Sequence, residues 1–270
     1  MYPELFKIGQ FTVYSFGLMQ AIGALAATYI LFLEAKRKGL DIFYTLEVVL
    51  LSICSIMIGG KLFYLIENWN SFIQNPAHYA LNFTGSTFYG GFILGIIVFY
   101  FYLKIKKIPF LFAADSVAPS LSVTYGFGRI GCHLAGDGCY GIPTNLPWAT
   151  NYENGTMPPS LMCRNMEIAE VYPNGVVPDN TPLHPTSVYE AIVAFIIFII
   201  LWKSRKKEWA SGKLFMLYLI LSSISRFLVE FIRLNPRVLF GFSEAQLIAI
   251  VLGIIGIAGF YKLSNNPKLI

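Results

Sequence analysis

The sequence predicts an all-α integral membrane protein with about seven transmembrane helices, its N-terminus outside and its C-terminus in the cytoplasm. Three observations support this fold class. The 270 residues are 56% hydrophobic and only 13% charged, whereas charged residues make up about a quarter of a soluble domain. Apolar stretches of about 20 residues, the length that crosses a bilayer as helix, recur along the chain. Basic residues are concentrated in alternate loops.

The apolar runs define the expected spans. Residues 1–11 lack a basic segment, and the run after them is long enough to span, so we expect no signal peptide. The seven spans are predicted near residues 12–33, 44–66, 86–103, 111–133, 186–202, 214–232 and 244–262.

The loops between these spans differ in charge. The loops after the first, third and fifth spans are basic, with Lys36, Arg37, Lys38; Lys104, Lys106, Lys107; and Lys203, Arg205, Lys206, Lys207. Residues 67–85 hold no Lys or Arg. Because basic loops stay in the cytoplasm, this asymmetry gives the predicted orientation. The net charge of +5 then reflects topology, and no nucleic-acid partner is expected.

Residues 134–185 interrupt the apolar pattern with a polar segment rich in Pro, Gly and Asn. A loop of this length is usually functional or a small folded unit. We therefore expect one membrane domain over residues 1–270, with an irregular external insert at 134–185. Shorter external segments are expected at 67–85 and 234–243.

The four cysteines, Cys54, Cys132, Cys139 and Cys163, do not have the paired spacing of a metal framework. We predict packed thiols or one structural disulfide, and neither a metal nor another cofactor. A metal site formed by Cys132, His133, Asp137 and Cys139 is the alternative.

Arginines inside the spans are the most informative polar residues. An ionised group at membrane depth costs roughly 2.5–3.5 kcal/mol on insertion scales, so such residues usually face a polar cavity. Arg129 lies in the fourth predicted span, and Arg226, Glu230 and Arg233 follow one helical face of the sixth. An arginine can hold a phosphate or carboxylate with two parallel hydrogen bonds. An anionic ligand is one interpretation, and a self-neutralising ion-pair ladder that includes Glu190 is the other.

Other polar residues are expected at the same outer level. Tyr89, Gly90 and Gly91 begin the third span, and His184 and Tyr189 open the fifth. Both spans start outside in the predicted topology, so a site in the outer half of the membrane is expected.

Gly126, Gly128 and Gly131 spell the G-x-G-x-x-G dinucleotide pattern. That motif requires a preceding strand and a βαβ unit. Here it lies inside a membrane span, so we expect these glycines to allow close helix packing.

Four segments in order resemble the prolipoprotein diacylglyceryl transferase family of bacteria. They are FYGG at 88–91, GRIGCHLAGDGCYGIPT at 128–144, HPTSVYEA at 184–191 and RFLVEFIR at 226–233. YSFGLM at 14–19 is similar to the first-span motif of the family. The resemblance covers nearly the whole chain, including the topology and the external insert.

The resemblance implies the activity. Members move the diacylglyceryl group of phosphatidylglycerol onto the thiol of a lipobox cysteine in a secreted prolipoprotein signal peptide, and glycerol phosphate leaves. Arg129 and Arg226 match the two essential arginines of the family, which would bind the phosphate. Glu230 and Arg233 match the accompanying pair, which would orient Arg226, and Gly141 matches an important glycine. His184 and Tyr189 match a further motif.

The chain departs from the family pattern at several positions. Tyr89 stands where many members have a histidine that is proposed to activate the thiol. Further departures are Phe16, Cys132 and Asp137. Three interpretations follow: Tyr89 acts only as a hydrogen-bond donor, a relocated base such as His133 or His184 serves, or the chain is a diverged paralogue.

The leading prediction is thus a transferase of the bacterial cytoplasmic (inner) membrane, with its active site facing the outer leaflet. The alternative is a non-catalytic receptor or transporter for an anionic lipid or small anion. Transporters commonly show repeated halves, and the sequence shows no repeat.

Overall fold

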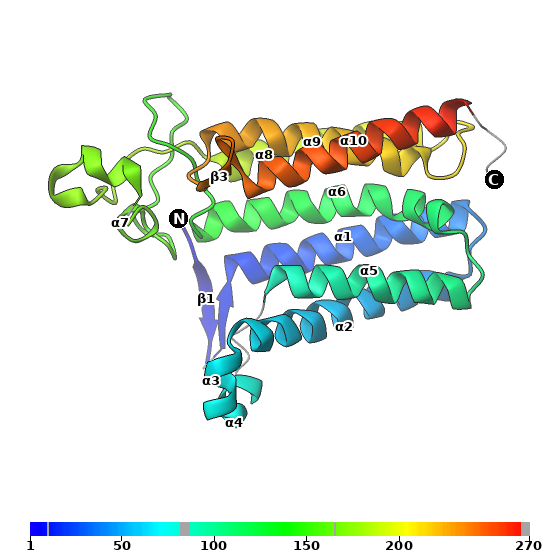
Figure 1. Cartoon of the computed structure of the whole chain (residues 1–270), viewed down its shortest axis with the longest axis horizontal. Helices are drawn as coiled ribbons and strands as arrows, with labels where there is room; N and C mark the ends of the chain where they lie inside the picture. Colours follow the sequence, from blue (N-terminus) through cyan, green and yellow to red (C-terminus); the bar gives the residue numbers. More distant parts are fainter. Residues whose placement is uncertain (10, 82–86, 165, 266–270) are drawn as a thin grey trace. The chain divides into compact units, whose positions relative to one another are not determined.

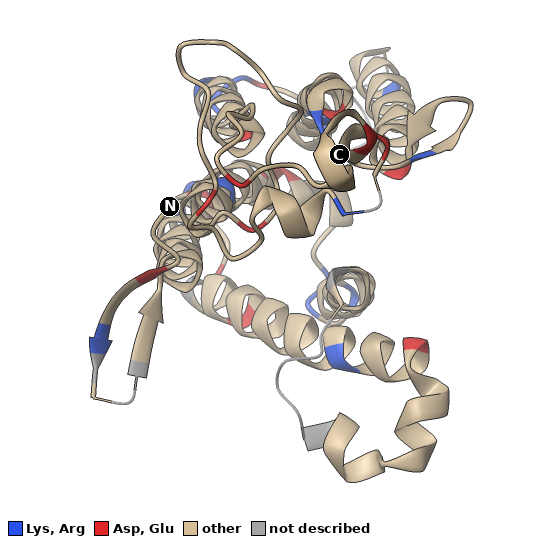
Figure 2. Ribbon diagram, turned by 90° about the vertical axis from the view of Figure 1, so that its left-hand side faces the viewer, with Lys and Arg blue, Asp and Glu red and all other residues tan. Residues whose placement is uncertain are grey.

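The computed structural model describes residues 1–9, 11–81, 87–164 and 166–265, and they are mostly helical (Figure 1). Among these residues, five helices are long and apolar enough to cross a membrane. Charged residues are sparse along the helical ribbons (Figure 2). The chain is a multi-pass membrane protein on this basis.

The elements follow one another in a simple order. The long helices are α1 (Ser15–Arg37), α2 (Ile42–Glu67), α5 (Phe88–Ile105), α6 (Phe110–Ala135), α8 (Thr186–Ser204), α9 (Lys213–Val229) and α10 (Glu244–Asn265). The short helices are α3 (Trp69–Gln74), α4 (Pro76–Leu81) and α7 (Pro159–Met162), with 3₁₀ turns η1 (Glu167–Val171), η2 (Pro173–Gly175) and η3 (Glu230–Ile232). Two antiparallel hairpins pair β1 (Glu4–Ile8) with β2 (Phe11–Tyr14) and β3 (Arg237–Leu239) with β4 (Phe242–Ser243).

Local residues explain where the helices begin and end. The Asp41 side chain accepts a hydrogen bond from the Phe43 amide at 3.0 Å and caps the N-terminus of α2. Gly136, with φ of 61°, follows the last residue of α6, and a residue in this left-handed conformation commonly ends a helix. Gly212, with φ of 95°, precedes α9.

The fold is helical with little sheet, as predicted, and the N-terminal hairpin moves only the start of the first span. The first span was expected from residue 12, but α1 begins at Ser15 because residues 11–14 form β2. The segment FTVY is β-branched and aromatic, which favours a strand. The Ser15 amide then donates to the Pro3 carbonyl at 2.9 Å, which joins the hairpin to the helix.

Five of the seven predicted spans coincide with the long apolar helices α1, α2, α8, α10 and the segment Lys213–Ile232. The other two predicted spans are also helical. The apolar part of α5 is shorter, over Tyr89–Ile105. α6 has 26 residues but includes Asp115, Pro119 and Arg129, which make it more polar. The count of seven and the orientation of the termini stay predictions.

The chain divides into two compact units: unit 1 is Met1–Ile30 with Val117–Ile270, and unit 2 is Leu31–Ser116. In unit 2, α2 packs against α5 at glycines. A Cβ atom on Gly90 would collide with the Gly59 carbonyl, and one on Gly91 would lie 2.9 Å from the Ile56 Cα. These glycines therefore allow two apolar helices to approach closely.

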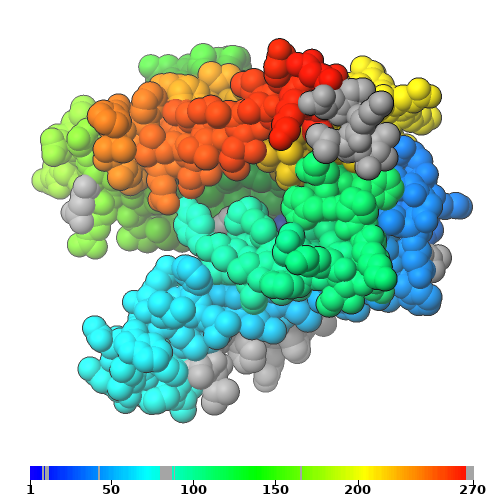
Figure 3. All heavy atoms as spheres, turned by 45° about the vertical axis from the view of Figure 1, so that its right-hand side comes forward, coloured from blue at the N-terminus to red at the C-terminus, as the bar shows by residue number. Residues whose placement is uncertain are grey.

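In unit 1, α9 and α10 lie side by side (Figure 1), and α10 forms a continuous orange-to-red surface in Figure 3. The G-x-G-x-x-G glycines lie within α6, as predicted. A Cβ atom on Gly126 would lie 3.0 Å from the Phe195 ring, and one on Gly131 would lie 3.2 Å from the Met19 Cβ. Close packing on α1 and α8 is therefore what these glycines provide.

The insert has small hydrophobic clusters of its own. Tyr140, Tyr152 and Leu183 are buried together, and a second cluster joins Cys163, Ala169 and Val177. Backbone bridges link Thr150 and Pro143 to Leu183. The segment is thus folded, although it holds few regular elements.

Candidate functional site

One buried carboxylate gathers three arginines from three segments of unit 1. Glu190 of α8 is 1% exposed in its side chain. Its Oε1 accepts from the Tyr125 hydroxyl at 2.6 Å and from Arg226 Nη1 at 2.8 Å. Its Oε2 lies 3.0 Å from Arg233 Nη1 and 3.3 Å from Arg129 Nε. The carboxylate therefore fixes guanidinium groups from α6, from α9 and from the residue after η3.

A second buried carboxylate, Glu230, completes the ion pairs. Its Oε2 lies 3.0 Å from Arg226 Nη2 and 3.9 Å from Arg233 Nε. Its Oε1 accepts from the Asn235 side chain, and Arg237 donates to its backbone carbonyl at 3.1 Å. The sequence predicted that Arg226, Glu230 and Arg233 share one face of an α-helix. Instead α9 ends at Val229 and continues as the 3₁₀ turn η3, so only Arg226 lies in the α-helix.

We call Arg129, Arg226, Arg233, Glu190 and Glu230 the arginine cluster. Three arginines face two carboxylates, which leaves one positive charge in excess. The Arg233 side chain is only 7% exposed, whereas Arg129 and Arg226 are 17% and 25% exposed. The Arg129 guanidinium also lies 4.9 Å from the centre of the Tyr125 ring. The cluster thus holds Arg129 and Arg226 rigidly with part of each surface accessible to an anion.

An apolar groove of about 420 Å³ extends from the cluster between α8 and α9. Tyr189, Glu190 and Ile232 belong to its lining, and most of the rest is aliphatic, including Val193 and Leu228. We call it the α8–α9 groove. A polar group and an apolar chain of one molecule fit this combination of charge and aliphatic wall.

Comparison with known proteins places this arrangement in a family. The model of the family described as prolipoprotein diacylglyceryl transferase matches residues 3–262. The chain belongs to the prolipoprotein diacylglyceryl transferase family. It is thus a membrane-embedded transferase of lipoprotein biosynthesis, which confirms the predicted family and enzyme class.

Curated relatives agree over nearly their full length. The chain is 37% identical over 262 residues to the phosphatidylglycerol–prolipoprotein diacylglyceryl transferase of Clostridium tetani, covering 96% of this chain and 97% of that protein. Proteins with the same name from Clostridioides difficile and Staphylococcus haemolyticus are each 32% identical, covering 94% and 99% of this chain and 92% and 90% of those proteins.

The structure brings together the four charged residues that the family resemblance singled out. Arg129, Arg226, Glu230 and Arg233 all belong to the arginine cluster. The ion-pair ladder also exists, since Glu190 pairs with all three arginines. Because the ion pairs leave one positive charge in excess, an ion-pair ladder and a site for an anionic ligand are compatible interpretations of the same residues.

Gly141 lies in the backbone that supports the cluster. Its amide donates to the His184 carbonyl at 2.9 Å, and it pairs with Arg233 in a β-bridge. A Cβ atom there would collide with the Ile232 carbonyl and lie 2.8 Å from Thr186 Cγ2. Glycine is therefore required for close backbone approach at this position of the family motif.

The Tyr189 hydroxyl contacts two side chains, Trp148 and His184. The Trp148 indole donates to the Tyr189 hydroxyl at 2.7 Å, and this hydroxyl lies 3.2 Å from His184 Nδ1. The Tyr189 hydroxyl thus accepts from the indole and also contacts the imidazole, which links the insert to the start of α8.

His133 lies at the base of the insert. Its Nδ1 is 3.1 Å from the Tyr152 hydroxyl. Burial raises the pKa of the Tyr152 phenol, so this hydroxyl stays protonated at neutral pH. The contact ties His133 to the hydrophobic cluster of the insert.

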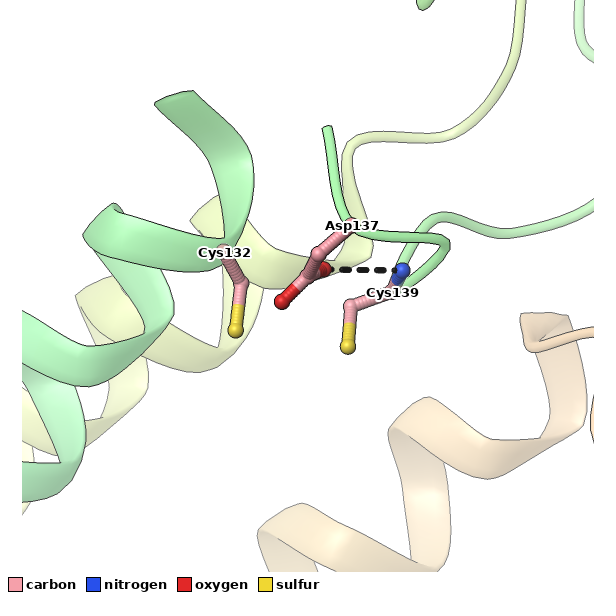
Figure 4. A group of neighbouring side chains, drawn as sticks. All are labelled: Cys132, Asp137 and Cys139. Atoms are coloured by element: carbon pink, nitrogen blue, oxygen red, sulfur yellow. Dashed lines mark hydrogen bonds between the residues drawn. The ribbon is translucent and has the colours of Figure 1, made fainter. Parts of the chain in front are cut away.

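All four cysteines are free thiols, so the predicted alternative of a disulfide is not found in this structure. Cys163 is buried in the insert, which raises the pKa of its thiol. Three of the four residues in the alternative metal set, Cys132, Asp137 and Cys139, do lie together (Figure 4). His133 is not part of that group.

Unit 2 contains Tyr89, Gly90 and Gly91. Tyr89 is half exposed near the start of α5. Gly90 and Gly91 pack against α2, which gives these glycines a structural role. Their predicted part in binding stays a prediction.

Three features of the site were not predicted from the sequence. Glu190 was assigned to an ion-pair ladder but is the residue on which the arginines converge. Tyr125 lies four positions before Arg129, on the same helical face, and that spacing could have identified it. Trp148 could not be found in this way, because the insert has no periodicity.

Proposed function

We propose that this chain transfers the diacylglyceryl group of phosphatidylglycerol to the thiol of the lipobox cysteine in secreted prolipoproteins. A thioether forms and glycerol phosphate is released. The observation that carries the proposal is the arginine cluster with one excess positive charge at the end of an apolar groove. The names of the relatives state the same pair of substrates for those proteins.

The charge and the groove suit an anionic lipid. Arg129 and Arg226 keep donors that are not used by Glu190 and Glu230, and both are partly exposed. An arginine fork suits a phosphate because two parallel N–H groups match two of its oxygens. The aliphatic wall of the α8–α9 groove would receive an acyl chain of the same molecule.

The reaction needs charge stabilisation at the leaving group. The thiolate sulfur attacks the glycerol carbon that carries the phosphate ester, the C–S bond forms, and the C–O bond to phosphate breaks. Glycerol phosphate leaves with the bond electrons and gains negative charge. Fixed guanidinium groups stabilise that charge more in the transition state than in the ground state, which lowers the barrier.

The proton of the thiol goes to a base, for which the three interpretations stay open. His184 Nδ1 is engaged with the Tyr189 hydroxyl at 3.2 Å, so this nitrogen would act as a base only after that contact breaks. His133 has the corresponding contact with Tyr152. A phenol is a weak base at neutral pH, so Tyr89 would serve as a hydrogen-bond donor.

We further propose that the site faces the outer leaflet of the bacterial cytoplasmic membrane. The basic loops after the first, third and fifth predicted spans support this orientation. The insert joins the C-terminal end of α6 to the N-terminal end of α8. It would meet secreted substrates on that side of the membrane.

The test is transfer of radiolabelled diacylglyceryl from phosphatidylglycerol to a lipobox peptide by the purified chain in nanodiscs. Arg129→Ala and Arg226→Ala should each lower kcat/KM at least about 100-fold, the effect of removing one donor to a developing anion. Arg164→Ala, at an exposed arginine of the insert, is the matched control and should keep full activity.

A well-folded wild-type chain that binds phosphatidylglycerol and transfers nothing would refute the proposal. That outcome would favour the non-catalytic receptor instead. Equal activity in Arg226→Ala and in the Arg164→Ala control would also refute the role assigned to the cluster.

A further inference from the structure

Two thiols and one carboxylate meet where α6 joins the insert. Cys132 lies in the last turn of α6, and Asp137 and Cys139 follow immediately. Gly136 and Gly138, with φ of 61° and 85°, reverse the chain and bring Cys139 back towards Cys132. The two sulfur atoms and a carboxylate oxygen all lie within 4.8 Å of one another (Figure 4).

The side chains are oriented by bonds of their own. One oxygen of Asp137, Oδ1, accepts from the Cys139 amide at 3.2 Å, and the other points between the two sulfurs (Figure 4). The Cys139 carbonyl accepts from Thr186 Oγ1 at 2.6 Å and from Ser187 Oγ at 2.9 Å. Both hydroxyl residues are buried at the start of α8, so the Cys139 backbone is held in place from outside the turn.

We propose that Cys132, Asp137 and Cys139 bind a thiophilic divalent cation of the zinc type. Two thiolates and a carboxylate are ligands that zinc commonly takes. In a tetrahedral zinc site, neighbouring ligand atoms lie roughly 3.5–3.8 Å apart, given bonds of about 2.0–2.3 Å. The observed separations, up to 4.8 Å, need to shrink by about 1.3 Å at most. The fourth position is left to water or another external ligand.

The surrounding charge is compatible with this cation. Two thiolates, one carboxylate and a divalent ion carry one negative charge in total. The neighbouring arginine cluster carries one positive charge in excess, and its Arg233 pairs in a β-bridge with Gly141, two residues after Cys139. The metal would therefore not add positive charge beside the arginines.

The bound ion would brace the backbone that supports the arginine cluster. Cys139 is two residues from Gly141, which pairs with Arg233. Fixing the turn between α6 and the insert therefore fixes Gly141 against Arg233. This inference does not depend on the proposed transferase reaction.

The experiment measures metal in the full chain, purified in nanodiscs from zinc-supplemented cells under reductant and without chelator. Elemental analysis should give about one zinc per chain, since a preformed thiolate site retains its metal through purification. Exchange for Co²⁺ should give a thiolate-to-cobalt charge-transfer band in the near ultraviolet. Cys132→Ser and Cys139→Ser should lose the zinc and the band, and Asp137→Asn should weaken zinc affinity at least tenfold.

Cys54→Ser is the matched control, because Cys54 is an exposed thiol of α2 in the other unit, and this variant should keep the metal. The Co²⁺ spectrum of the wild type makes the test independent of whether a variant folds. A wild-type chain with no zinc above the Cys132→Ser level and no cobalt–thiolate band would overturn the proposal. Recovery of Cys132 and Cys139 as a disulfide from reduced preparations would overturn it as well.

Discussion

Replacing Glu190 by Gln removes the carboxylate that three arginines share. The side chain is 1% exposed and keeps nearly the same shape in the variant, so the change is mainly one of charge. The excess positive charge of the cluster rises from one to two. Breaking a buried ion pair costs about 3–5 kcal/mol. Because Arg129 and Arg226 are partly exposed, we expect the lower end, about 3 kcal/mol of unfolding free energy.

This loss should be visible as a lower unfolding temperature. For a chain of this size about 1 kcal/mol corresponds to roughly 2–4 °C, so Glu190→Gln should unfold roughly 6–12 °C below the wild type in nanodiscs. Glu153→Gln, at an exposed glutamate of the insert, is the matched control. Added phosphate or phosphatidylglycerol should recover part of the loss in Glu190→Gln. An unfolding temperature equal to that of the control would refute the central role of Glu190.

Two further predictions rest on local geometry. Gly141→Ala puts a Cβ atom against the Ile232 carbonyl and should cost about 1–3 kcal/mol, as overpacking does. Gly17→Ala in α1, where a Cβ meets nothing within 4 Å, should not lower the unfolding temperature in the same assay, because alanine favours a helix over glycine. Burial lowers the pKa of the Lys38 ammonium from 10.5 to about 8. Between pH 8 and pH 10.5, Lys38 is therefore more protonated in the unfolded chain than in the folded chain. The free energy of unfolding should then rise as the pH increases from about 8 to about 10.5. Methyl-lysine NMR should show the Lys38 midpoint near 8, and a midpoint above 10 would contradict its burial.

The helices could be predicted from the sequence because long apolar runs have few other stable structures in a bilayer. The bounds of α8 and α10 differ from the predicted spans by only a few residues at their C-terminal ends. The hairpin of β1 and β2 was not predicted, because β2 (FTVY) runs without a polar break into the apolar span that follows. Hydropathy does not distinguish a short strand from the first turn of a helix.

The candidate site was predictable as a set of charges but not as a network. Arg129 and Arg226 are conspicuous because charge is costly inside an apolar span. Their common partner Glu190 lies on a different helix, and only the packing of α6, α8 and α9 shows that the three meet. The insert contributes through Trp148 and Gly141, whose contacts depend on irregular backbone that has no periodic signal.

The order in which the network is synthesised has a consequence for membrane insertion. Arg129 is translated with α6, whereas Glu190 belongs to α8 and follows the whole insert. A nascent chain that has delivered α6 to the bilayer therefore holds an arginine whose carboxylate partner does not yet exist. Such a segment is unfavourable in lipid, so it should remain near the translocon or a chaperone until α8 arrives. Chains truncated before α8 should accordingly be removed by membrane proteases faster than chains that end after α9.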